Sequence, residues 1–129
     1  YKRLCDHANS ISQASNLDIA DFFCRHLVVD DLWISLGESL MISRHSPVWN
    51  VLVEGFGNHN PGKGRIAGKR PLWDMLHPGR SWADSFPEND VSAEKIGQQA
   101  LSFLSERYTV IPNFAGSRVK YDVVETSDE

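Results

Sequence analysis

The sequence predicts an α+β fold in which helices and strands alternate along the chain. Apolar residues recur at helical spacing over 32–44 and 92–108, which indicates two long amphipathic helices. The run FFCRHLVV at 22–29 is rich in β-branched and aromatic residues, and residues 119–123 alternate between apolar and charged; both patterns are typical of strands. The expected order is helix, strand, helix, long loop, helix, strand.

The first half of the chain carries three of these elements. A helix is expected over 2–14, because its apolar residues fall on one side. After the 22–29 strand, an aspartate at 30 or 31 caps the second helix, and Pro47 ends it at about Arg44 because proline disfavours a helical residue before it. Residues 48–54 form a short apolar segment for which periodicity leaves helix and strand both open.

The second half opens with a long loop, 55–83, that contains six glycines and three prolines. A loop of this length in a compact domain is usually functional or disordered. Ser92 is the expected N-cap of the 92–108 helix. An acidic tail begins at Glu125, and we expect it to fray.

Charge is distributed unevenly along the 129 residues. The formal net charge of -4 argues, as an average, against a nucleic-acid partner. Residues 55–82, however, carry five basic residues and one acidic residue, so the remainder has a net charge of -8. A flexible basic loop with interleaved aromatic residues is typical of segments that follow a phosphate backbone, although a solvated surface loop is an open alternative. Its basic residues are Lys63, Arg65, Lys69, Arg70 and Arg80.

The location of the protein follows from its composition. No apolar run approaches the roughly 18 residues of a membrane span, and the first residues do not resemble a signal peptide. Two cysteines do not make a disulfide framework. We therefore expect a cytoplasmic protein that does not contact a membrane.

Two familiar motifs are excluded. Gly57, Gly62 and Lys63 match part of a phosphate-binding P-loop, but Gly64 stands where the metal-binding serine or threonine is needed. The histidines and cysteines lack zinc-finger spacing.

A better candidate site combines polar residues of the two early helices. Arg3 and His7 lie four apart and share a helix face. Glu38 stands among apolar neighbours on the second helix, and Asn50 follows that helix. Together they supply a cation, a titratable group, a metal-binding carboxylate and an amide, which suffice for metal-assisted phosphodiester hydrolysis. From the pattern alone, a surface glutamate at the edge of an apolar stripe is an open alternative for Glu38.

Four separated stretches carry a family resemblance, in the family's order. YKRLCDHANSI, LVVDDLWISLGESLMISRHSPVWN, GFGNHNPGKGR and PLWDMLHPGRSWA closely resemble the Eco29kI-like type II restriction endonucleases of the GIY-YIG nuclease superfamily. The similarity runs from Tyr1 to about Ala83. It implies a site-specific endonuclease that hydrolyses phosphodiester bonds of duplex DNA.

The resemblance also implies residue roles. Arg3 matches the arginine that contacts the scissile phosphate, and His7 matches a histidine that assists proton transfer or holds the phosphate. Glu38 matches the glutamate that binds one divalent cation, normally Mg²⁺, and Asn50 matches an asparagine that supports the geometry of the active site. In such an enzyme, the five basic residues of the loop become candidate DNA contacts.

The same resemblance implies a domain organisation. Residues 1–54 correspond to the C-terminal part of a GIY-YIG core, here helix–strand–helix, and residues 55–129 to a family-specific extension whose loop 55–83 contacts DNA. The two tyrosine-bearing strands that name the superfamily are not found in the sequence. We therefore expect a truncated form with little cleavage activity alone.

Partners follow from the same comparison. Double-stranded DNA is the expected ligand, and a homodimer is expected because palindromic targets match a two-fold protein. A non-catalytic DNA-binding module and an inactive structural remnant of such an enzyme are the alternatives.

Overall fold

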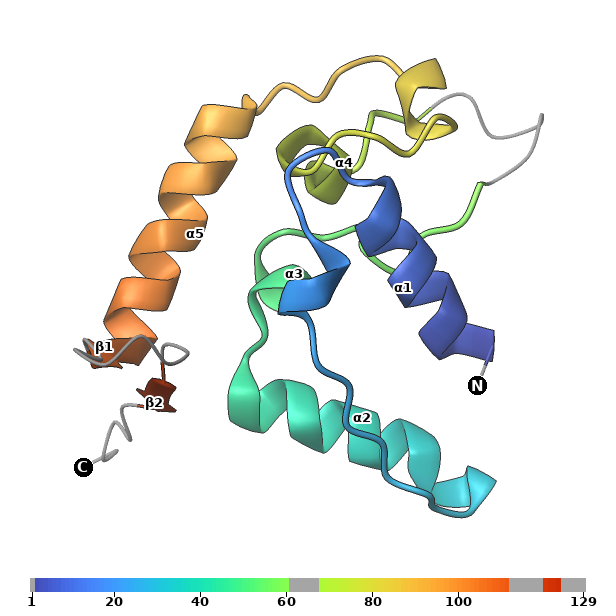
Figure 1. Ribbon diagram of the computed structural model, residues 1–129, viewed down its shortest axis with the longest axis vertical. Coiled ribbons are helices and arrows are strands. Elements are labelled where there is room, and N and C mark those ends of the chain that lie inside the picture. The colour runs from blue at the N-terminus through green and yellow to red at the C-terminus, as the bar shows by residue number, and fades with distance from the viewer. Residues whose placement is uncertain (1, 61–67, 112–119, 124–129) are drawn as a thin grey trace.

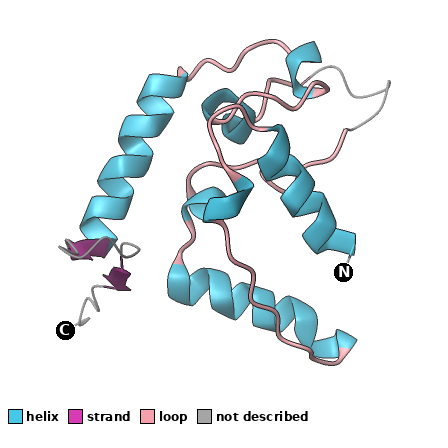
Figure 2. Ribbon diagram, viewed as in Figure 1, coloured by secondary structure: helices cyan, strands magenta, loops and turns pink. Residues whose placement is uncertain are grey.

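The computed structural model describes residues 2–60, 68–111 and 120–123, and nearly all of its regular structure is helical (Figures 1 and 2). Two short 3₁₀ turns, η1 (Ile19–Asp21) and η2 (Ala83–Ser85), stand in the connections. Within these ranges the α-helices are α1 (Lys2–Gln13), α2 (Asp31–His45), α3 (Val48–Val51), α4 (Leu72–Leu76) and α5 (Ala93–Arg107).

The sheet of the described residues is a two-stranded antiparallel hairpin. It pairs β1 (Tyr108–Ile111) with β2 (Lys120–Val123), so that Tyr108 lies opposite Val123. β1 continues directly from α5, and the hairpin lies at the end of that helix (Figure 1).

The predicted α+β fold class, with its helix–strand–helix core, is wrong. The core of the described residues is made by helices, and residues 22–30 run as extended chain without strand pairing. Leu27 and Val28, which were expected inside a sheet, are 84% and 86% exposed. An apolar run becomes a strand only if a neighbouring strand satisfies its backbone groups, and the described chain supplies none beside it.

The three long helices agree closely with the expected ranges, whereas α4 lies within residues 55–83, which were expected to form a loop. α1 and α5 begin and end within a residue or two of the predictions, and the amide of Lys95 donates to Oγ of Ser92 as the cap requires (3.4 Å). α2 ends at His45, where Ser46 adopts a left-handed conformation (φ 40°) before Pro47. The open segment 48–54 begins with the single turn of α3.

Trp73 of α4 is the centre of the core. Its side chain is fully buried together with Val53, Ala14 and Ile96, which come from the segments around α3, α1 and α5. Trp49 meets the Trp73 ring edge-on, with ring centres 5.7 Å apart. Because these four residues form one buried cluster, they join separate parts of the chain into one core.

The C-terminal end of α1 is fastened to the chain that leaves α4. The amide of Ser15 donates to the carbonyl of Pro78 (2.8 Å). The side-chain amide nitrogen of Asn16 donates to the carbonyl of Leu76 (2.9 Å), and the side-chain oxygen of Asn16 lies 3.0 Å from Nδ1 of His77. These contacts set the position of α1, which carries Arg3 and His7.

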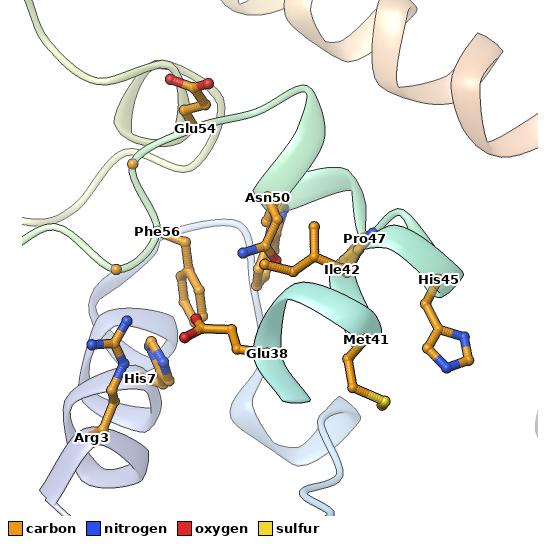
Figure 3. A pocket seen from close by; sticks show the side chains of 13 residues that line it. Arg3, His7, Glu38, Met41, Ile42, His45, Pro47, Asn50, Glu54 and Phe56 are labelled. Carbon is orange, nitrogen blue, oxygen red and sulfur yellow. The ribbon is translucent and has the colours of Figure 1, made fainter. Parts of the chain in front are cut away.

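α2 differs from the other long helices because it buries none of its residues. The amphipathic spacing that predicted it leaves large apolar side chains in solvent, among them Leu32, Leu36 and Leu40. The helix lies to one side of the core in Figure 1. Its polar contribution to the site includes Glu38, which extends toward α1 (Figure 3).

Candidate active site

A pocket of about 600 Å³ opens between α1, α2 and the segment that follows α2. Arg3 and His7 line it from α1, Glu38 from α2 and Asn50 from α3 (Figure 3). Apolar side chains, including Met41 and Ile42, form much of the remaining wall. The four residues named as candidates from the sequence therefore share one cavity, although they come from three separate helices.

α1 presents Arg3 and His7 side by side because residues four apart lie one helical turn apart. Figure 3 shows both side chains projecting from α1 into the pocket. The backbone at Gly57 lies beside Arg3: a Cβ at that position would lie 3.8 Å from a terminal guanidinium nitrogen, an ordinary van der Waals distance. The guanidinium is exposed, so it is free to meet a phosphate.

The imidazole of His7 is held in a defined orientation. It stacks on the ring of Phe56, with ring centres 4.6 Å apart and an interplanar angle of 15°. Partial burial and the positive charge of Arg3 lower the pKa of His7 below its ordinary value of 6.5, although Asp6 opposes this shift. The ring is therefore mainly neutral at pH 7 and can accept a proton.

Glu38 and Asn50 lie on the other side of the pocket. The carboxylate of Glu38 extends from α2 toward His7 and Phe56, and Asn50 projects from α3 (Figure 3). Both side chains are exposed to solvent. Carboxylate and amide oxygens are hard ligands of the kind that Mg²⁺ prefers.

This donor set fits only one kind of cation site. Among the described residues, no group of three or more histidine, cysteine, aspartate and glutamate side chains could enclose a metal ion. Mg²⁺ is commonly held by one or two carboxylates, with water and substrate phosphates completing the shell. Glu38 fits such an open site and does not fit a cage made by the protein alone.

Comparison with known protein families identifies the family of the chain that forms this pocket. The profile of the family described as Eco29kI GIY-YIG domain matches residues 1–104, which include α1 to α4, the whole pocket and most of α5. The chain belongs to the Eco29kI GIY-YIG family. This family consists of nucleases of the restriction-endonuclease type, and membership implies DNA binding. No individual curated protein matches the chain.

The basic segment of this Eco29kI-family chain is only partly described. Lys63 and Arg65 lie outside the described residues. Lys69 forms an ion pair with Asp90 on the surface. Arg70 donates from Nε to the carbonyl of Ala83 (3.3 Å). Lys69 is exposed and Arg70 half-buried, and both stay candidates for DNA contact.

Arg80 has a different environment from the one expected of a DNA contact. Its side chain is 1% exposed and forms a bidentate ion pair with the buried carboxylate of Asp74, with both distances 2.6 Å. The guanidinium is therefore withdrawn from the surface in this structure. Asp74, its partner, is the one acidic residue of segment 55–82 in the sequence.

Phe56 and Gly57 are among the pocket residues that were not named as site candidates from the sequence. Phe56 stacks on His7, and Gly57 lies beside the guanidinium of Arg3. Both belong to the stretch GFGNHNPGKGR, which carries the family resemblance.

Among the described helices of this family member, none has the length and apolarity to cross a membrane.

Proposed function

We propose that the pocket hydrolyses phosphodiester bonds of duplex DNA with one divalent cation, normally Mg²⁺. The observation that carries the proposal is the convergence of Arg3, His7, Glu38 and Asn50 on one cavity. Membership of a nuclease family supports the substrate class. We further propose that the protein acts as a homodimer, because a two-fold protein matches a palindromic target.

Each side chain has a distinct task in this proposal. Arg3 binds the phosphoryl oxygens and offsets their growing negative charge. His7, neutral at pH 7, takes a proton from the attacking water while the water oxygen bonds to phosphorus and the bond to the leaving oxygen breaks. Glu38 holds the cation, which offsets charge on the leaving oxygen when bound. Asn50 donates or accepts hydrogen bonds beside these groups.

Glu38→Gln tests the proposal, since it removes the carboxylate charge with little change of shape. Plasmid cleavage with Mg²⁺, which we expect to be weak in the wild-type chain, should fall by at least about 100-fold, because a catalytic cation contributes several kcal/mol. Mn²⁺ binding, followed by electron paramagnetic resonance in the presence of a DNA duplex, is expected to weaken in parallel. Duplex binding itself, measured without metal as a function of salt, should persist.

The matched control is Asp31→Asn, which neutralises another carboxylate of α2, in its first turn and outside the pocket. It should retain both cleavage and Mn²⁺ binding. Unchanged cleavage in Glu38→Gln would remove Glu38 from the mechanism. A wild-type chain that binds duplex DNA but never cuts it would reduce the function to a DNA-binding module.

A further inference from the structure

The guanidinium of Arg80 lies between two indole rings in the interior of the protein. Its central carbon is 4.4 Å from the centre of the Trp73 ring and 4.8 Å from that of Trp82. Asp74 supplies the compensating charge. A buried arginine with one carboxylate still has three N–H groups to satisfy, because the guanidinium has five donors.

Those three donors all go to one short segment of backbone. Nη1 donates to the carbonyls of Phe56 and Asn58, each at 3.1 Å, and Nη2 donates to the carbonyl of Gly55 at 2.9 Å. Every N–H of Arg80 thus has an acceptor. Lysine, with three donors on one atom, cannot reproduce this planar arrangement.

The segment that Arg80 holds is the wall of the pocket on the α1 side. Gly55 has φ +115°, and a Cβ there would lie 2.5 Å from Cβ of Pro71, so the backbone turns sharply at the start of the segment. The next residue, Phe56, stacks on His7. A displacement of this backbone therefore moves the surface on which the imidazole rests.

We propose that Arg80 is a positioning residue, which acts through the backbone of residues 55–58 and the ring of Phe56 to orient His7. The proposal rests on the proposed function, in which His7 takes the proton. In this proposal the buried ion pair of Arg80 and Asp74 has a role beyond stability. The three charge-assisted hydrogen bonds of Arg80 to the backbone fix the position of Phe56, and the Phe56 ring fixes the plane of the His7 imidazole.

The test reads the orientation of His7 directly by NMR. Protons of an imidazole stacked over a phenyl ring resonate upfield because of the ring current. Phe56→Leu removes that ring while keeping an apolar side chain, so the His7 ring protons should move downfield. Arg80→Lys keeps the charge beside Asp74 but gives up the backbone acceptors, so it should move the same protons in the same direction.

Arg70→Lys is the matched control, because Arg70 donates to the carbonyl of Ala83 and makes no hydrogen bond to residues 55–58. It should leave the His7 resonances in place. A folded Arg80→Lys protein with unshifted His7 resonances would overturn the proposal. Phe56→Leu keeps the proposal open to refutation if Arg80→Lys does not fold, because unshifted His7 resonances in Phe56→Leu would show that the Phe56 ring does not orient His7.

Kinetics supply a second measurement that separates this inference from the proposed function. Misplacement of a proton acceptor should lower kcat for DNA cleavage by about 10- to 100-fold in Arg80→Lys, with little change of KM. When Arg80→Lys is added to Phe56→Leu, kcat should fall little further, because the loss of the Phe56 ring has already separated Arg80 from His7. Absence of cleavage in the wild type refutes the proposed function, whereas the NMR shifts still decide whether Arg80 orients His7.

Discussion

Gly79→Ala probes the junction that holds α1 in place. Gly79 has φ +143°, a region that residues with a side chain rarely adopt, and it lies directly against the end of α1. A Cβ there would lie 2.8 Å from the carbonyl carbon of Gln13 and 3.2 Å from Cα of Ala14, with the Gln13 oxygen closer still. These atoms are backbone, so no rotation of a side chain relieves the overlap.

The expected loss follows from these contacts. A non-glycine residue in a sparsely populated backbone region costs about 1–3 kcal/mol. Forcing extra atoms into a closely packed position costs about 1–3 kcal/mol more. The second cost includes the hydrogen bond from Ser15 to Pro78, which must lengthen if the two segments separate. We expect the free energy of unfolding to fall by about 2–6 kcal/mol, a large part of the roughly 5–15 kcal/mol of an ordinary domain.

Urea unfolding followed by fluorescence of the four tryptophans measures this loss. Gly37→Ala is the control, because Gly37 lies inside α2 and a Cβ there would meet nothing within 4 Å. That change should stabilise the protein by about 0.5–1 kcal/mol, since alanine is the better helix former. Gly79→Ala with the stability of the wild type would refute the close approach of α1 to the 78–79 turn.

Two further predictions concern the core and its response to pH. Ile96→Ala should cost about 2–5 kcal/mol in urea unfolding because Ile96 is 2% exposed, whereas Leu101→Ala on the same helix, at 70% exposure, should change stability by less than about 0.5 kcal/mol. Burial lowers the pKa of His77 below its ordinary value of 6.5, so the unfolded chain binds the extra proton more readily. The His77 contribution to stability should therefore be complete above pH 6.5 and decline as the pH falls below it. When the free energy of unfolding is measured from pH 5 to 8, it should depend less on pH in His77→Gln than in the wild type. The same pH dependence in both proteins would contradict this reasoning.

The three long helices were predictable because their hydrogen bonds close within a few residues. Proline, caps and apolar spacing marked α1, α2 and α5 within a residue or two, since each signal acts on its own turn of helix. The 22–29 strand was not predictable in the same way. Its backbone requires a partner elsewhere in the chain, and an apolar run carries no information about whether that partner is adjacent.

The sequence by itself determined the three long helices, the uneven charge and, through resemblance, the family and four of the residues that line the pocket. Tertiary structure alone decided which of the described basic residues is internal. Arg80 and Lys69 are both cations of one segment, but Arg80 is enclosed by Trp73, Asp74 and the carbonyls of residues 55–58, whereas Lys69 stays on the surface. Burial of a charge depends on whether acceptors converge on it in space, and local sequence does not specify that convergence.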